Sequence, residues 1–287
     1  MPELPEVEVV KKSLTNSLIK SRLLKIIIKD KNLRYKLKSE DFKKIKDTQI
    51  SNIKRRAKYL LINFNNDMVM LTHLGMTGKF LLKNKSKKEI KTGFHDSNKR
   101  LKKHDHVIFF FNKNLNLIYN DVRKFGFIKI LQTKKINSNL HIKNLGPEPL
   151  SKKFNLYYFL KNIEKRKTYL KDLLMNQKFI SGLGNIYVNE AIFLSKMSPK
   201  IRANEISNDQ ISSLILNIKK ILKKAFYEGG SSIKDFNNTK GKKGNFQQFF
   251  NVYDREGEIC TRPNCMGKII RIKISNRSTF FCGKCQK

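Results

Sequence analysis

LGPEPL, residues 145–150, marks the point at which the pattern of the sequence changes. Two prolines and a glycine within six residues cannot continue a helix or a central strand, so the segment predicts a domain boundary. Before it, short apolar runs separated by Asn, Asp, Gly and Lys are typical of β-strands. After it, apolar residues recur at helical spacing. The segment therefore separates a β-rich first part from a helical second part.

The first part has the pattern of an antiparallel sandwich or barrel. Runs rich in Ile, Val, Phe and Leu predict strands at residues 23–29, 59–64, 68–74, 107–111, 115–119 and 125–131. A helix is expected before them, because Pro5 suits a first turn and Glu3 and Glu6 favour the positive end of a helix dipole. Residues 83–103 are polar and rich in Lys, and they predict a loop.

Three helices are predicted in the second part. Two of them, at residues 167–176 and 185–195, flank a turn at 181–184. The third begins at Ser207, which forms a capping box with Gln210, and it ends before the glycine pair at 229–230. The remaining tail is rich in Gly and Lys and ends in a cysteine cluster.

Composition restricts the classes of function. The 287 residues include 61 Lys and Arg against 23 Asp and Glu, a net charge of +38, and 39% are hydrophobic. That apolar content excludes a disordered basic tail. No apolar run is long enough to span a membrane and no signal peptide is present, so membrane and secreted proteins are excluded. The charge indicates a polyanionic partner, most simply nucleic acid, although a bias toward Lys, Asn and Ile inflates its size. An anionic membrane is the rival partner, but no basic amphipathic helix stands out.

The cysteines form the strongest local motif. All four lie in the last 28 residues with the spacing Cys-x4-Cys-x16-Cys-x2-Cys: Cys260, Cys265, Cys282 and Cys285. Two pairs joined by a strand-forming stretch predict a tetrahedral thiolate site on a hairpin, which would hold one structural Zn²⁺. Two disulfides or free thiols are the alternative. Basic residues crowd the hairpin, as in a nucleic-acid finger or an ordinary solvated face: Arg271, Lys273, Arg277 and Lys284.

The N-terminus offers a nucleophile. If Met1 is removed, Pro2 presents a secondary amine that can attack an electrophilic carbon and form an iminium, with Glu3 or Glu6 to move protons. Taken alone, the same residues also suit ordinary capping of a first helical turn.

Two further motifs are weaker. The glycines of residues 182–184 precede a helix start at Asn185, where backbone N–H groups can hold a phosphate. His104-Asp105-His106 has spacing that suits a strand-borne metal site, but without a third ligand a structural or phosphate-contacting role is favoured. Phe109–Phe111 and Phe249–Phe250 are assigned to the core.

Together these blocks resemble the bacterial formamidopyrimidine-DNA glycosylases, enzymes of base-excision repair. The resemblance runs from end to end and rests on PELPEVE (2–8), RAKYL (56–60), HLGMTG (73–78), KHDH (103–106), DVRKFG (121–126), GPEPL (146–150), residues 182–190, residues 229–231 and the cysteine motif. It implies an α+β multidomain fold: an N-terminal catalytic β-sandwich with flanking helices (1–135), a hinge linker (136–150), a helix–two-turn–helix domain (151–236), and a lesion-loop and zinc-finger region (237–287) with its β-hairpin finger at 252–286. DNA would lie in the cleft between the domains.

The resemblance also implies roles for single residues. Pro2 would attack the sugar C1′ and Glu3 would donate a proton, after which β and δ eliminations cut the strand. Lys58, Asn185 and Arg277 would bind phosphates around the flipped nucleotide. Met76, Arg123 and Phe125 would fill the void that the base leaves. The implied DNA-binding set is completed by His73, His104, Lys171 and Tyr187; Lys171 would handle oxidised guanine, and residues 239–246 would cover the flipped base.

The sequence departs from the family pattern in few places. Val122 and Lys124 replace a usual proline and arginine, and the first cysteine pair has four intervening residues in place of the commoner two. Leu4, Met76 and Phe125 favour the purine-repair branch over relatives specialised for oxidised pyrimidines. The expectation is therefore a cytoplasmic, monomeric bacterial enzyme acting on damaged double-stranded DNA. A non-catalytic zinc-finger DNA-binding protein is the alternative from a different class.

Overall fold

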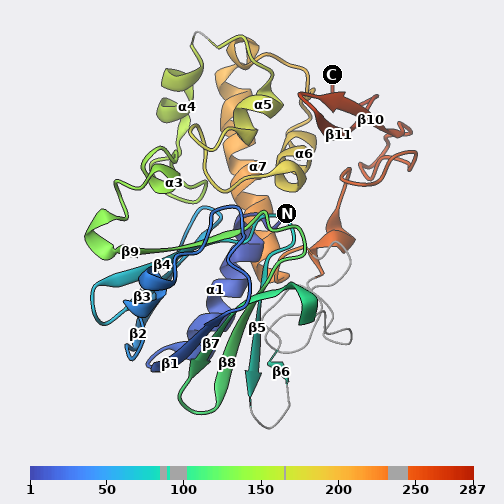
Figure 1. Ribbon diagram of the computed structural model, residues 1–287. Coiled ribbons are helices and arrows are strands. Elements are labelled where there is room, and N and C mark those ends of the chain that lie inside the picture. Colours follow the sequence, from blue (N-terminus) through green and yellow to red (C-terminus); the bar gives the residue numbers. More distant parts are fainter. Residues whose placement is uncertain (85–88, 91–101, 165, 232–244) are drawn as a thin grey trace. The chain divides into compact units, whose positions relative to one another are not determined.

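The computed structural model describes residues 1–84, 89–90, 102–164, 166–231 and 245–287, and the chain divides into two units (Figure 1). The first unit comprises Met1–Lys143 and Glu228–Asn245, and the second comprises Asn144–Tyr227 and Phe246–Lys287. Most of the predicted Lys-rich loop at 83–103 lies outside the described residues, as does the greater part of the predicted base-covering loop at 239–246.

The first unit contains two antiparallel sheets. One has the strand order β1-β7-β8-β5-β6, with β1 at Leu23–Ile28, β7 at Asp105–Phe111, β8 at Leu115–Asn120, β5 at Lys79–Asn84 and β6 at Glu89–Ile90. The other has the order β2-β3-β4-β9, with β2 at Ile50–Arg56, β3 at Tyr59–Phe64, β4 at Met68–His73 and β9 at Phe127–Gln132. Alternation along β3, where every second side chain is buried, directs one face of that sheet to the core.

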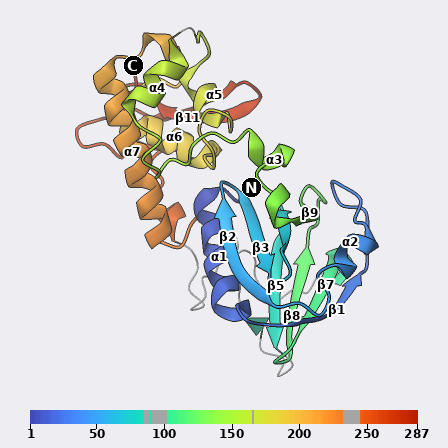
Figure 2. The same cartoon turned by 90° about the vertical axis from the view of Figure 1, so that its left-hand side faces the viewer.

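Helix α1 (Leu4–Leu18) completes this core. Its apolar residues Val7, Val10, Leu14 and Leu18 are buried in the same cluster as side chains from both sheets. Figure 2 shows α1 running beside strand β2. Two short helices, α2 (Ser39–Lys43) and α3 (Leu140–Lys143), complete the helices of this unit that the structure describes. The N-terminus of the chain is therefore fixed by a helix that is part of the core.

The second unit is helical and has its own core. Its helices are α4 (Leu156–Ile163), α5 (Leu170–Met175), α6 (Asn185–Leu194) and α7 (Asn208–Tyr227). The capping box at Ser207 is confirmed, because the Ser207 N–H donates to Gln210 Oε1 at 3.0 Å and the Gln210 N–H donates to Ser207 Oγ at 3.3 Å. The chain leaves α7 through Gly229 and Gly230, both with positive φ, as the sequence predicts.

A β-hairpin of strands β10 (Ile269–Ile274) and β11 (Arg277–Cys282) ends the second unit. Its inner residues pack with Phe193 of α6 and with cysteines in a small separate cluster. The expected α+β architecture, with an antiparallel two-sheet unit, a helical unit and a terminal hairpin, is confirmed.

The structure differs from the prediction at element ends and in several extra elements. The strand expected at 125–131 begins at Phe127, because residues 121–126 form a tight loop in which Lys124 has a φ of +55°. The helix expected at 167–176 begins at Leu170. Strands β2, β5 and β6 and helices α2, α3 and α4 were not predicted.

Candidate functional site

The N-terminal turn is buried and braced. Pro2 and Glu3 are both buried, and the Glu3 N–H donates to Glu6 Oε2 at 2.9 Å, which closes the first turn of α1. Pro5 lies within that turn, where its fixed φ suits a helix start. Met1 is 47% exposed, and the Pro2 nitrogen becomes a free amine only when Met1 has been removed. The turn therefore holds the expected nucleophile and proton donor in one fixed conformation.

Glu6 also ties this turn to the segment after α7. Its Oε1 accepts hydrogen bonds from the Ser231 N–H at 2.8 Å and from Ser231 Oγ at 2.9 Å. Gly230, with a φ of +83°, passes so close that an added Cβ would lie 3.1 Å from Glu6 Oε1. A carboxylate buried to this degree needs such donors. Ser231, which follows α7, is thus joined to the first turn of α1 by two hydrogen bonds.

His73, at the end of β4, has a defined tautomer. The Gly75 N–H donates to its Nδ1 at 3.0 Å, which places the proton of a neutral ring on Nε2. The ring stacks on Phe127 with centroids 5.9 Å apart and lies 4.9 Å from the Tyr59 ring. Burial first, and then the cations Lys58 and Arg34 and nearby His141, lower the pKa of His73 to about 4. The ring is therefore neutral at pH 7.

Lys58 lies beside this histidine in the turn between β2 and β3, immediately after Ala57. Its side chain is 5% exposed, so the ammonium is mostly withdrawn from water. It is the cation that contributes most to the low pKa of His73. The sequence predicts both residues in the site, and in the structure the Lys58 charge is near enough to His73 to help keep its ring neutral.

Three side chains that the resemblance linked are in contact. Arg123 Nη1 lies 3.1 Å from Met76 Sδ, and the Arg123 guanidinium carbon lies 4.5 Å from the centroid of the Phe125 ring. Met76 is 44% exposed and Phe125 46% exposed. Together with Met1, Arg34, His73, Gly75 and Lys124, these three line a pocket of about 590 Å³. We call the side chains of Met76, Arg123 and Phe125 the exposed trio. The first unit thus brings Met1, His73 and this trio to one cavity.

The histidine motif does not form a metal site. His104 ends a short 3₁₀ turn (Lys102–His104) and is half-buried, and its carbonyl accepts from the Asp121 N–H at 3.1 Å. Asp105 accepts from Asn120 Nδ2 at 2.8 Å, and His106 Nε2 lies 2.7 Å from the Asp121 carbonyl. Within the described residues, the cysteine cluster is the single group of three or more side chains close enough to share a metal ion.

In the second unit, Lys171 and Asn185 meet at one backbone carbonyl. Lys171 Nζ donates to Ser278 O at 2.8 Å and to Thr279 Oγ1 at 2.7 Å, and Asn185 Nδ2 donates to the same Ser278 O at 2.9 Å. Burial, with the nearby Arg277 charge, lowers the pKa of Lys171 to about 8 against the opposing effect of Asp172. Lys171 is 1% exposed, so its ammonium is withdrawn from water. Its hydrogen bonds hold strand β11 at Ser278 and Thr279, directly after the exposed Arg277.

Tyr187 is fully buried in the second core and its ring lies 5.5 Å from that of Phe246. Its assignment as a DNA-contacting residue stays a prediction from the resemblance. The side chain itself packs within the protein in this structure.

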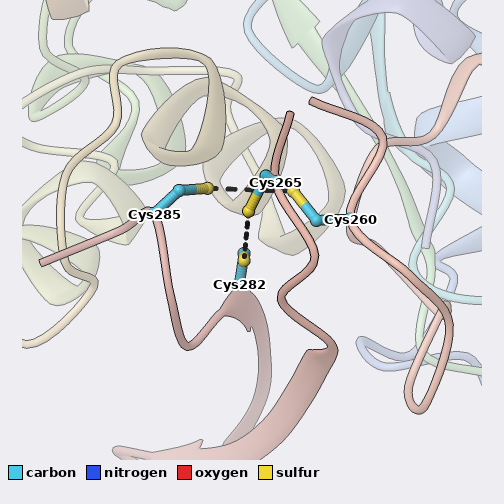
Figure 3. A group of neighbouring side chains, drawn as sticks. All are labelled: Cys260, Cys265, Cys282 and Cys285. Atoms are coloured by element: carbon cyan, nitrogen blue, oxygen red, sulfur yellow. Dashed lines mark hydrogen bonds between the residues drawn. The ribbon is translucent and has the colours of Figure 1, made fainter. Parts of the chain in front are cut away.

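The four cysteines converge as the spacing predicts (Figure 3). Their sulfur atoms all lie within 4.8 Å of one another, with Cys260 and Cys285 3.7 Å apart and Cys265 and Cys282 3.7 Å apart. Thiolates at about 2.3 Å from a tetrahedral Zn²⁺ would be about 3.8 Å from each other, so the geometry fits this ion. Burial raises the pKa of Cys282, but backbone N–H groups of Cys285 and Lys284 outweigh it and lower the value to about 7.

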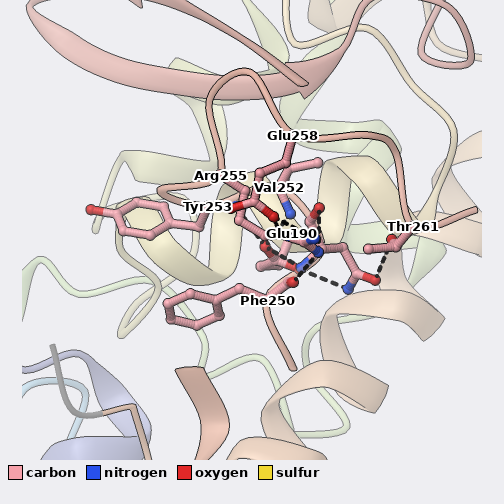
Figure 4. A network of polar contacts seen from close by, with 8 residues as sticks. Glu190, Phe250, Val252, Tyr253, Arg255, Glu258 and Thr261 are labelled. Atoms are coloured by element: carbon pink, nitrogen blue, oxygen red, sulfur yellow. Dashed lines mark hydrogen bonds and ion pairs between the residues drawn. The ribbon is translucent and has the colours of Figure 1, made fainter. Parts of the chain in front are cut away.

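A buried carboxylate that sequence reasoning missed anchors this end of the chain. Glu190, on α6 and fully buried, accepts backbone N–H donors from Asn251, Val252 and Tyr253 at 2.8 to 3.0 Å (Figure 4). These three residues lead into the cysteine region. A single charged residue inside a largely buried helix was the available signal, since such a group needs several donors.

Comparison with known proteins agrees with this geometry. Residues 1–128 match the family described as "Formamidopyrimidine-DNA glycosylase N-terminal domain", and residues 145–237 match its "H2TH domain". The chain is 42% identical to the formamidopyrimidine-DNA glycosylase of Rickettsia bellii (strain OSU 85-389) over 287 residues, covering 100% of both chains. It is 38% identical to that of Ruegeria sp. (strain TM1040), again covering 100% of both chains.

Solved structures give the same result. A complex of Lactococcus lactis Fpg with DNA containing an abasic site matches with a TM-score of 0.87, 32% identity and 99% coverage of each chain. A complex of a mutant of the same protein with DNA containing Fapy-dG matches with a TM-score of 0.88, 32% identity and 100% coverage of each chain. No helix in the described part of the chain is long and apolar enough to cross a membrane. The chain belongs to the formamidopyrimidine-DNA glycosylase family, the DNA glycosylases of base-excision repair that also act as abasic-site lyases.

Proposed function

We propose that this protein removes oxidised purines, 8-oxoguanine and formamidopyrimidines, from double-stranded DNA and cuts the abasic strand through an iminium on Pro2. The observation that carries the proposal is the buried, braced turn of Pro2 and Glu3, which adjoins Met1 at the pocket of about 590 Å³ lined by His73 and the exposed trio. A nucleophile held in one conformation beside a cavity has little orientation entropy left to lose on reaction.

The chemistry follows from the secondary amine. The nitrogen lone pair of Pro2 forms a bond to C1′ of the damaged nucleotide while the bond from C1′ to the base breaks. Glu3 donates a proton to the sugar ring oxygen, the ring opens, and a cationic iminium joins Pro2 to C1′. Loss of a C2′ proton then expels the 3′ phosphate, and loss of a C4′ proton expels the 5′ phosphate. Water releases the remaining fragment and restores the amine.

Other residues of the chain would hold the DNA during these steps. Lys58 and Arg277 supply positive charge for phosphates near the flipped nucleotide, and Asn185 contributes an amide at the start of α6. His73 is neutral and would donate a hydrogen bond to the DNA from Nε2, because its Nδ1 already accepts from the Gly75 N–H. Clamping the backbone offsets the few kcal/mol that base extrusion costs.

The exposed trio would occupy the space that the base leaves. Met76 and Phe125 are apolar and half-exposed, and Arg123 can donate to the unpaired opposite base. The contacts of Arg123 with both Met76 and Phe125 support this shared task.

We also propose one structural Zn²⁺ held by Cys260, Cys265, Cys282 and Cys285, since their sulfur atoms already fit a tetrahedral site. When bound, the ion supplies folding free energy to the hairpin and takes no part in the chemistry. The working unit is a monomer in the bacterial cytoplasm, where free thiols persist as metal ligands.

The test is borohydride trapping on a duplex with 8-oxoguanine opposite cytosine, with the adduct mapped by mass spectrometry. The expected result is one adduct on Pro2 of protein from which Met1 has been removed. Protein with an N-terminal extension is the matched control, and it should form none, because its Pro2 nitrogen is an amide. An adduct with thymine glycol DNA but not with 8-oxoguanine DNA would move the substrate to oxidised pyrimidines. No adduct on either duplex would favour a binding protein without catalytic activity.

A further inference from the structure

One buried carboxylate holds the two loops that carry the exposed trio. Asp121 is fully buried. Its Oδ1 accepts from Thr77 Oγ1 at 2.5 Å and from the Arg123 N–H at 3.3 Å, and its Oδ2 accepts from the Gly126 N–H at 2.8 Å. Hydrogen bonds to an ionised acceptor in a buried place are among the strongest available to a protein. Asp121 therefore fixes both ends of the loop at residues 121–126.

The Thr77 hydroxyl joins this loop to the one that carries Met76. While it donates to Asp121, it accepts from the Arg123 N–H at 3.0 Å. A single hydroxyl thus uses both its donor and its acceptor capacity between the two loops. The loops also touch directly, since a Cβ on Gly75, whose φ is +63°, would lie 2.5 Å from the Gly126 nitrogen.

The far side of the second loop is anchored as well. Lys124 Nζ donates to Asp30 Oδ2 at 2.6 Å, and the Asp121 carbonyl lies 2.7 Å from His106 Nε2. The loop at residues 121–126 is thus held by a side-chain contact and by a backbone contact. The Met76 and Phe125 side chains nevertheless remain half-exposed. Without DNA, Arg123 already contacts both of them.

We propose that Asp121 and Thr77 are positioning residues that hold Met76, Arg123 and Phe125 as one preformed wedge. The inference rests on the proposed function, because a wedge is useful only where a base is extruded. Two loops that are already ordered before DNA binds lose no further conformational entropy when the base is extruded. The partners of Asp121 and Thr77 are groups of the two loops, and neither residue has a proposed role at the sugar, so the chemistry on an already exposed sugar should not need them.

The test compares Thr77→Val with Thr77→Ser and with Thr72→Val. Thr77→Val keeps the size of the side chain but removes the bridge, and Thr77→Ser restores it. Thr72 is the matched control, because it is fully buried and its hydroxyl has no hydrogen-bond partner in the described part of the chain. Asp121→Asn is a second variant, since its NH₂ group would face one of the donors that the carboxylate now accepts. Thermal unfolding confirms that each variant is folded.

Two substrates separate wedge insertion from chemistry. The first is a duplex with 8-oxoguanine opposite cytosine, and the second is a single strand with a preformed abasic site, which has no base to extrude. Thr77→Val should lower kcat/KM on the duplex at least about tenfold, as small misplacements do, and change cleavage of the single strand less than about twofold. Fluorescence of 2-aminopurine beside the lesion should show slower opening. Thr77→Ser and Thr72→Val should match the wild type.

Two results would overturn the inference while leaving the proposed function intact. One is Thr77→Val matching Thr72→Val on the duplex. The other is an equal loss on both substrates, because that would indicate general damage to the fold. A wild-type protein that cleaves neither substrate would instead overturn the proposed function, and this inference with it.

Discussion

His73 is surrounded by groups that disfavour its charged form. The ring is packed between Phe127 and Tyr59. Lys58 and Arg34 add positive potential to the cost of burial, and the pKa falls to about 4. Tyr35, His141 and Lys129 complete the surrounding cluster, with Lys129 Nζ 4.1 Å from the Tyr35 ring centroid and 3.3 Å from His141 Nε2. No acidic group is in contact with the ring in the described structure to offset these effects.

This environment predicts a stability effect with a definite sign. Between the ordinary histidine pKa of 6.5 and about 4, the unfolded chain binds a proton at His73 and the folded chain does not. Falling pH therefore favours unfolding, and the contribution is lost as pH decreases through this window. Relative to His73→Gln, which cannot titrate, the wild type should lose about 2 kcal/mol of unfolding free energy from about pH 7 to about pH 5. Urea unfolding at a series of pH values measures the difference, and two parallel pH profiles would contradict the prediction.

Lys171 illustrates which part of a site the sequence cannot supply. The resemblance implied a residue that handles oxidised guanine, and that role stays a prediction. Its observed hydrogen-bond partners, Ser278 and Thr279, lie more than 100 residues further along the chain. Nothing local in the sequence links them, because a lysine and a strand become neighbours only through tertiary packing. The same limit hid the bonds from Glu6 to Ser231 and from Thr77 to Asp121.

Among the helices and strands, those with a strong local sequence pattern were predicted and those with a weak one were missed. Helix α7 was predicted from its capping box and regular apolar spacing, and β3 and β4 from compact apolar runs. Strand β2 was missed because its sequence, ISNIKRR, has only two buried side chains among polar ones. Helix α4 was missed although it is amphipathic, since it follows the Lys-rich stretch after the domain boundary and has only eight residues. Short elements depend on their neighbours for stability, and their own sequence says little.

The hairpin of β10 and β11 should depend on the proposed Zn²⁺ for its fold. The unit is small, and zinc binding provides folding free energy that so few apolar residues cannot. Removing zinc by chelation should unfold the hairpin, detach Arg277, and deprive Lys171 and Asn185 of their shared acceptor at Ser278 O. Cleavage of lesion-containing duplex should fall at least about 100-fold and return when zinc is added back. Metal analysis should give one zinc per chain, and Co²⁺ should produce a thiolate charge-transfer band. Full cleavage by metal-free protein would rule out this dependence.

Over the whole molecule, the change of pattern at residues 145–150 lies close to the division between Lys143 and Asn144, but the pattern does not indicate which later residues group with the first unit. The described residues Glu228–Ser231 group with the first unit although they follow helix α7 of the second. Glu6 provides the physical reason, because it binds Ser231 from a position 225 residues earlier. A contact between two residues so far apart in the chain leaves no periodic pattern in the sequence. The sequence pattern alone therefore groups Ser231 with helix α7, which precedes it.

Because the chain has a net charge of +38, its affinity for DNA should depend strongly on salt concentration. Each phosphate neutralised by Lys or Arg releases counterions, so the logarithm of affinity should fall linearly with the logarithm of salt concentration. With two such contacts, Lys58 and Arg277, the slope would be about −1.8, and affinity for a duplex with a stable abasic analogue would drop about 12-fold from about 50 to about 200 mM salt. Lys58→Gln should reduce the slope by about 0.9. Lys46→Gln is the control, since Lys46 is exposed, pairs with Asp47 at 3.7 Å and belongs to no part of the proposed site. A slope near zero, or equal changes in both variants, would mean that the charge is compositional and that binding rests on other contacts.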